Sequence, residues 1–155
     1  MIYLLSFPRS GNHAVRFVAE FVTARPTRGC SSGDVPLRDN AYPTLPGILS
    51  HVDATAPPVL TKTHAPNVVR DDVTGLVVIV RDYRECVVKF TDYMKRADDV
   101  VAACVRQYAD VVRAYVRCRV PKLYLSYERF LRDPRTTACK LFSFLSRQEP
   151  NTFDD

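Results

Sequence analysis

This 155-residue chain contains four short apolar runs, each followed by polar residues or by the start of a helical pattern. Short runs that are apolar throughout are typical of strands buried on both faces of a parallel sheet, and their alternation with helices indicates an α/β fold. We therefore expect a three-layer α/β sandwich with a mostly parallel central sheet. The four predicted strands are Ile2–Phe7, Val59–Thr63, Leu76–Val80 and Leu123–Tyr127.

The segments between these runs carry apolar residues at helical spacing. The pattern that starts at His13 ends at Arg25, because Pro26 cannot continue a helix. The last helix is expected to begin at Asp133-Pro134, since proline is favoured in the first helical turn. Two further helices are expected over residues 85–95 and 98–117.

The length and composition fit one domain over residues 1–155, because 46% of the residues are hydrophobic and a real core can form. The net charge of +5 comes from 22 Lys and Arg against 17 Asp and Glu, spread along the chain. This distribution suits a small polyanionic ligand such as a phosphorylated nucleotide, and it lacks the basic block of a nucleic-acid arm. We therefore expect no nucleic-acid partner.

The sequence also bears on the compartment. No apolar stretch approaches the length of a membrane span, and the apolar start over residues 1–7 is too short for a signal sequence. The five cysteines are odd in number and none has CxxC spacing, so we expect reduced thiols, with neither a zinc site nor a disulfide framework. These features predict a cytoplasmic protein without a membrane span.

The turn between the first predicted strand and the first predicted helix is the most informative segment. Free backbone N–H groups and the helix dipole make such a position an anion site. Gly11 allows a tight turn and a close approach to a ligand, while Ser10 and Asn12 can donate hydrogen bonds. Arg9 adds a forked charge suited to phosphate oxygens. The Walker pattern GxxxxGK[ST] is missing, and a turn of this composition can also be purely structural.

Polar residues follow the other three predicted strands as well. Lys62 and His64 close the second strand, Arg81 follows the third, and Tyr127 closes the fourth. Each has an ordinary structural explanation, such as a surface ion pair or a core position. Because parallel α/β sheets bind ligands at the carboxyl ends of their strands, we expect these residues to share one rim with the first turn.

At these positions the chain resembles the sulfotransferases that use 3'-phosphoadenosine 5'-phosphosulfate (PAPS), over nearly all of Ile2 to Leu145. The resemblance implies a sulfotransferase fold of the P-loop NTPase type and, by analogy with P-loop folds, a first strand in the sheet interior. The strand order is then expected to be second, third, first and fourth. The segments that carry the resemblance are Phe7-Pro8-Arg9-Ser10-Gly11-Asn12, Lys62-Thr63-His64, Arg81-Asp82-Tyr83-Arg84-Glu85, Tyr127-Glu128 and Asp133-Pro134.

The resemblance also assigns a donor site. Arg81 would hold the 3'-phosphate with help from Lys89, which stands where the family usually has a serine. His13 replaces the second threonine of the family's loop, and Tyr127 would complete the donor pocket. The C-terminal segment with an RKG-type donor clamp is absent from these 155 residues. Ser10, Gly11 and Asn12 are expected to cradle the 5'-phosphosulfate, and the other donor-binding residues of this loop are Pro8, Arg9 and His13.

The activity implied is transfer of a sulfuryl group from PAPS to an acceptor hydroxyl or amine. Arg9 and Lys62 would stabilise charge that grows on the leaving oxygen, so no metal is expected. His64 is the expected general base, because imidazole titrates near working pH. The acceptor, which the motifs do not specify, is expected to approach through residues 27–58 and the helix end over 90–96. Candidate residues there are Tyr42, His51, Phe90 and Tyr93.

Two other functions remain open on the sequence. One is a small P-loop-type kinase, against which the missing Walker lysine and the lack of an acidic magnesium-binding strand end both argue. The other is a non-catalytic nucleotide-binding or interaction module of the same fold. Oligomeric state has no signature in the sequence.

Overall fold

The computed structural model describes residues 1–29, 50–68, 73–94 and 100–148. Its five strands form one sheet in the order β2-β3-β1-β4-β5, and every pairing in it is parallel. The strands are β1 (Ile2–Ser6), β2 (Thr27–Gly29), β3 (Leu60–Thr63), β4 (Gly75–Val80) and β5 (Lys122–Ser126). The predicted α/β class and the interior position of the first strand are confirmed.

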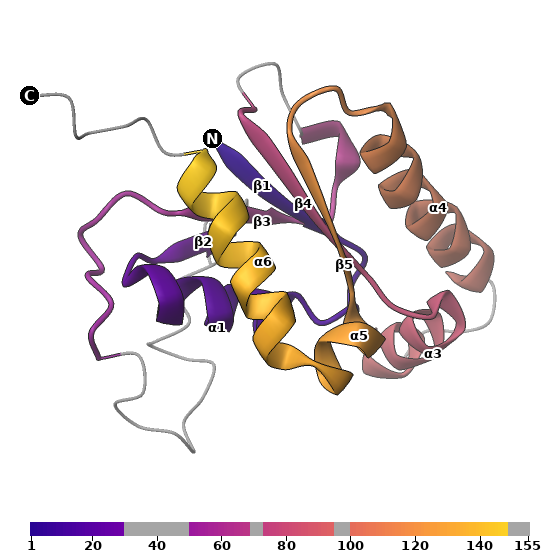
Figure 1. Cartoon of the computed structure of the whole chain (residues 1–155). Coiled ribbons are helices and arrows are strands. Elements are labelled where there is room, and N and C mark those ends of the chain that lie inside the picture. The colour runs from indigo at the N-terminus through magenta and orange to yellow at the C-terminus, as the bar shows by residue number, and fades with distance from the viewer. Residues whose placement is uncertain (30–49, 69–72, 95–99, 149–155) are drawn as a thin grey trace, which may run out of the picture.

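Helices cover both faces of this sheet and make three layers (Figure 1). Successive side chains of a strand point to opposite faces, so Leu4 packs with α1 and α6 while Leu5 packs with α4. Both leucines are fully buried. The helices are α1 (Asn12–Thr23), α3 (Tyr83–Met94), α4 (Val101–Arg117), α5 (Tyr127–Arg132) and α6 (Pro134–Arg147), with the short 3-10 helix η1 (Pro66–Val68) after β3.

The predicted strand order is wrong in one exchange. The expected order placed Leu76–Val80 next to Val59–Thr63, whereas the structure places β1 there, with Leu4 in register with Lys62. β4 instead pairs with the other side of β1 and with β5. Both β1 and β4 are apolar on both faces, so apolar patterning alone does not say which of them borders β3.

Element boundaries also differ from the predicted ones at two places. Tyr127 does not close the fourth strand but begins α5, where the Ser126 hydroxyl accepts a hydrogen bond from the Arg129 N–H at 3.2 Å. Residues 27–58 are expected from the sequence to form one long loop on the acceptor side, but residues 27–29 of this segment form β2, paired with β3. The last helix begins as predicted, at Pro134, with the Asp133 carboxylate accepting from the Thr136 N–H at 3.0 Å.

The described part of the expected acceptor loop packs near the C-terminal end of α1. The Asp53 N–H donates to the Ala24 carbonyl at 3.0 Å, and the His51 Nε2 lies 2.9 Å from the Phe21 carbonyl. His51 is therefore bound to α1 at the end far from the α1 N-terminus. Tyr42 lies outside the described residues. Within the described ranges, no helix is long and apolar enough to cross a membrane.

A buried polar group joins α1 to β2. The Arg16 Nε donates to the Thr27 hydroxyl at 2.7 Å, and that hydroxyl donates to the Glu20 carboxylate at 2.5 Å. The Thr27 N–H donates to the same carboxylate oxygen at 2.9 Å. All three side chains are essentially inaccessible to solvent. Because buried charges are tolerated only with partners, this threonine is central to the local stability.

Replacing Thr27 by valine should test that role. Thr27→Val keeps the shape and removes the hydroxyl between two buried ionic groups, so we expect a loss of about 1–3 kcal/mol in unfolding free energy, measured by urea denaturation. Thr61→Val, in the neighbouring strand, is the matched control, since the Thr61 hydroxyl donates to the neutral Met1 sulfur at 3.7 Å rather than to a buried carboxylate. Equal midpoints for the two variants would contradict the proposed role.

Candidate functional site

The carboxyl ends of β1, β3, β4 and β5 meet at one edge of the sheet, because all four strands are parallel neighbours. Residues 7–13 follow β1, His64 follows β3, Arg81 follows β4 and Tyr127 follows β5. This edge is where ligands bind in open α/β sheets. The structure thus places the segments singled out from the sequence beside one another.

The turn after β1 has an unusual backbone. Gly11 has φ 94° and Arg9 has φ 66°, both in the left-handed region. This region is uncommon for a residue with a side chain, and such residues are concentrated at functional sites. The Ser10 N–H donates to the Phe7 carbonyl at 3.2 Å, and the Ala14 N–H donates to the Gly11 carbonyl at 3.1 Å, which closes the turn and starts α1.

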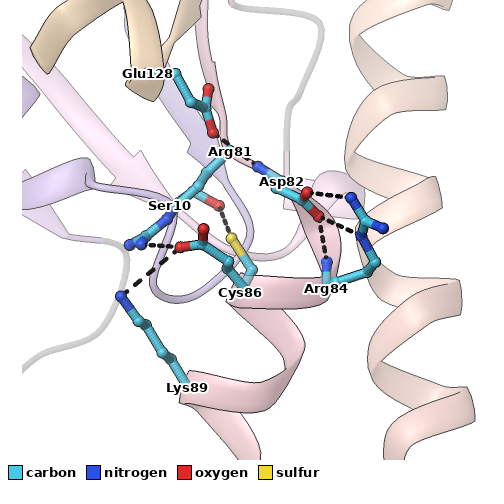
Figure 2. A network of polar contacts seen from close by, with 8 residues as sticks. Ser10, Arg81, Asp82, Arg84, Cys86, Lys89 and Glu128 are labelled. Atoms are coloured by element: carbon cyan, nitrogen blue, oxygen red, sulfur yellow. Dashed lines mark hydrogen bonds and ion pairs between the residues drawn. The ribbon is translucent and has the colours of Figure 1, made fainter.

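Two polar side chains of this turn are buried. Ser10 is fully buried, and its hydroxyl lies 3.4 Å from the Cys86 sulfur of α3 (Figure 2). Burial raises the pKa of the Cys86 thiol, so the contact joins two neutral groups. Asn12 is 8% exposed, and its Oδ1 has no hydrogen-bond partner among the described residues. A buried amide oxygen without a partner is costly, and because it only accepts, it lacks a hydrogen-bond donor.

The other residues assigned to the turn lie nearer the surface. Pro8 is half-buried and His13 is exposed in the first turn of α1. The Arg9 guanidinium lies 4.0 Å from the centre of the Tyr93 ring, near the C-terminal end of α3. Arg9 therefore extends from the turn toward the helix end that the sequence associates with the acceptor.

Arg81 and Lys89 converge on one carboxylate. The Arg81 guanidinium pairs with Glu85 Oε2, and the Lys89 Nζ lies 3.8 Å from the same oxygen (Figure 2). The Arg81 side chain is 14% exposed and the Glu85 side chain 56% exposed. Two cations that meet at a single oxygen define a position for an anion, which Glu85 occupies here. Glu85 ends one of the segments that carry the family resemblance, but no role is predicted for it, since an exposed acid in a helix is ordinary.

The Tyr127 ring connects this cation pair to the turn after β1. The Arg81 guanidinium stacks over the Tyr127 ring, with 4.6 Å between the guanidinium carbon and the ring centre. The same ring packs against Gly11 so closely that an added Cβ would come within 2.7 Å of its Cε2. One aromatic ring thus separates the α1 N-terminus from the Arg81–Lys89 pair.

His64 is fixed by the end of β1. Its Nδ1 lies 2.6 Å from the Ser6 carbonyl oxygen and 3.3 Å from the Ser6 hydroxyl. A carbonyl oxygen only accepts, so Nδ1 carries the proton in this contact, and the neutral ring then has its lone pair on Nε2. The Gln107 side chain of α4 donates to the His64 carbonyl at 3.4 Å. Backbone and ring are therefore both held.

The turn after β4 has its own ion pair. Asp82 accepts from the Arg84 guanidinium at 2.7 Å and from the Arg84 N–H at 2.9 Å. These hydrogen bonds lower the pKa of Asp82 to about 2, so its carboxylate is ionised throughout the working range. The Arg84 side chain, which is 74% exposed, therefore pairs with Asp82 and does not join the Arg81–Lys89 pair. Across the described ranges, no group of three or more His, Cys, Asp or Glu side chains is arranged to hold a metal ion.

The parallel sheet, its flanking helices and the turn after β1 define a sulfotransferase-like fold. The solved structure of mouse sulfotransferase SULT7A1 in complex with PAP is similar to this chain, with a TM-score of 0.59 and 20% sequence identity. The similarity covers 94% of this chain and 57% of that one, so this chain spans little more than half of its length. No protein-family model and no curated protein sequence matches the chain. The sulfotransferase-like fold expected from the sequence is confirmed.

Gly11→Ala should disrupt the contact between the turn and Tyr127. The left-handed backbone alone costs a residue with a side chain about 1–2 kcal/mol, and the new methyl group must also displace the ring. We expect a clearly lower urea midpoint than for Gly75→Ala, whose Cβ would lie 3.2 Å from the Phe144 Cζ. If the two alanine variants were equally stable, the close packing of Tyr127 on Gly11 would be wrong.

Proposed function

We propose that this chain binds PAPS and transfers its sulfuryl group to an acceptor hydroxyl or amine. The observation that carries the proposal is the Tyr127 ring in contact with both Gly11 and Arg81. It brings a helix N-terminus and a pair of cations close together at one sheet edge. A nucleotide with phosphate groups at two positions of its ribose needs two such anion sites close together.

The residues present fit this donor. The turn after β1, with Arg9 and Gly11 in the left-handed region, leads into the α1 N-terminus, where backbone N–H groups favour negative charge. Residues 8–13 would hold the 5'-phosphosulfate, and Arg81 with Lys89 would hold the 3'-phosphate in place of the Glu85 carboxylate. That the similar mouse sulfotransferase was solved with PAP supports a nucleotide of this type.

Three side chains would share the chemistry. His64, with its Nδ1 held by the Ser6 carbonyl, would accept the acceptor's proton at Nε2. Lys62 and Arg9 would stabilise the charge that develops on the leaving oxygen. Lys62 lies on β3 in register with Leu4, one pair before the last residue pair that joins β1 to β3. Fixed cations of this kind cost no reorganisation at the moment of transfer.

Arg81→Ala tests the donor assignment. Losing charged hydrogen bonds to a 3'-phosphate should weaken binding of PAP about 10- to 100-fold, while binding of 5'-AMP should change little, as measured by calorimetry. Lys89→Ala should act in the same direction with a smaller effect. Arg84→Ala is the matched control, because Arg84 is paired with Asp82 and should leave both affinities unchanged. An equal loss for both nucleotides would remove Arg81 from the 3'-phosphate.

Lys62 and His64 should differ in what their loss does to turnover. His64→Ala removes the proton acceptor and should lower kcat by roughly 10²–10⁴-fold with donor binding nearly intact. Lys62→Ala should cost about 3 kcal/mol in transition-state stabilisation, again mainly in kcat. In a pH–rate profile, the acidic limb should vanish with His64→Ala and persist with Lys62→Ala. Full activity with an unchanged limb in the His64 variant would assign the base to another group.

Incubation with radiolabelled donor and a mixed acceptor panel, with and without EDTA, separates the candidate functions. Label transfer that persists in EDTA supports the proposed sulfotransferase. Donor binding without transfer would favour a non-catalytic nucleotide-binding module. Magnesium-dependent phosphate transfer would favour a kinase.

A further inference from the structure

The peptide group between Arg81 and Asp82 is held at both of its polar atoms by side chains. The Tyr108 hydroxyl donates to the Arg81 carbonyl at 2.6 Å, and the Asp82 N–H donates to Glu128 Oε1 at 3.0 Å. Tyr108 belongs to α4 and Glu128 to α5, so the two contacts come from different helices. Figure 2 shows Glu128 reaching Asp82 on the far side of the network from Lys89.

This peptide group lies just past the end of a strand. β4 ends at Val80, so the following backbone groups have no place in the ladder of the sheet and need other partners. A turn in this position could meet its hydrogen-bond needs with water. Here two side chains supply these hydrogen bonds. They thereby fix the orientation of the peptide plane that follows the Arg81 Cα, and with it the direction of the Arg81 side chain.

Tyr108 and Glu128 are themselves held in place by neighbouring side chains. Glu128 uses its second oxygen to accept from the Ser126 hydroxyl at 2.8 Å. Burial opposes ionisation of Glu128, but the hydrogen bonds from the Asp82 N–H and the Ser126 side chain outweigh it and lower the pKa of Glu128. The Tyr108 ring packs against Phe7, with 5.6 Å between ring centres. Burial raises the pKa of Tyr108 to about 12, so its hydroxyl remains a donor at any working pH.

We propose that Tyr108 and Glu128 are positioning residues that aim Arg81, and that they thereby set the preference for a nucleotide with a 3'-phosphate over one without. The inference rests on the proposed function. A guanidinium binds phosphate well only when its fork is correctly oriented, so small rotations of its peptide are costly. Stacking on Tyr127 fixes the far end of the same side chain, at 4.6 Å. Arg81 is therefore held at its base and at its tip.

Tyr108→Phe removes a single oxygen atom and gives the cleanest test. We expect binding of PAP to weaken about 3- to 10-fold in calorimetry, with binding of 5'-AMP changed less than the error. Glu128→Ala should do the same, whereas Glu128→Gln keeps an acceptor oxygen for the Asp82 N–H and should retain most of the affinity. Tyr115→Phe, also on α4, is the matched control and should change neither affinity.

The Arg81→Ala background separates positioning from general structure. If Tyr108 and Glu128 act through Arg81, then Tyr108→Phe should cause no further loss of PAP binding once Arg81 is gone. An undiminished further loss, or an equal loss of 5'-AMP binding, would overturn the positioning role. Tyr108→Phe keeps this test decisive even if Glu128→Ala folds poorly.

Amide hydrogen exchange of the ligand-free protein provides a readout independent of nucleotides. The Asp82 N–H should exchange slowly in the unmodified protein, faster in Glu128→Ala and slowly again in Glu128→Gln. Rapid exchange in the unmodified protein would overturn the inference. If the unmodified protein shows no preference for PAP over 5'-AMP, the proposed function falls and the positioning role falls with it. A preference that depends on Arg81 but not on Tyr108 or Glu128 overturns only the positioning role.

Discussion

The rest of the structure depends on the burial of β1 between two parallel neighbours. Leu4 and Leu5 are both fully inaccessible, one in each face of the sheet, and the strand is hydrogen-bonded to β3 and β4 at once. A strand that is hydrogen-bonded on both edges and buried on both faces can adopt only one position and one register. The register of β1 therefore fixes the position of the turn that follows it, beside the carboxyl ends of β3 and β4. What binds there meets a preformed arrangement.

Apolar patterning predicted the fold class and the four longer strands because these strands are buried on both faces. It missed β2, since Thr27-Arg28-Gly29 has no apolar side chain and becomes a strand through pairing with β3. Composition favours an interior position in the sheet for both β1 and β4, so only the structure shows which of the two borders β3.

For the candidate site, the sequence could predict which residues follow the strands but not their orientation. The Ser10 hydroxyl lies against Cys86, on a helix far along the chain, and no sequence pattern indicates this contact. The sequence does not predict a role at the site for Glu85 or Tyr108, because an acid in a helix and an aromatic residue at a core spacing are both ordinary. Contacts between residues so distant in sequence depend on how α3 and α4 pack on the sheet, which no local pattern encodes.

The carboxylate of Glu85 acts as a tethered competitor at the position where Arg81 and Lys89 meet. Because it is attached to the same helix as Lys89, its effective concentration there is high and independent of dilution. In the proposed donor site, a free anion would first have to displace this carboxylate, so a multiply charged group would be favoured over a monoanion. In the absence of a ligand, the Glu85 carboxylate also balances the positive charges of Arg81 and Lys89. In the proposed site, selectivity for charge would thus follow from an acid that belongs to the protein itself.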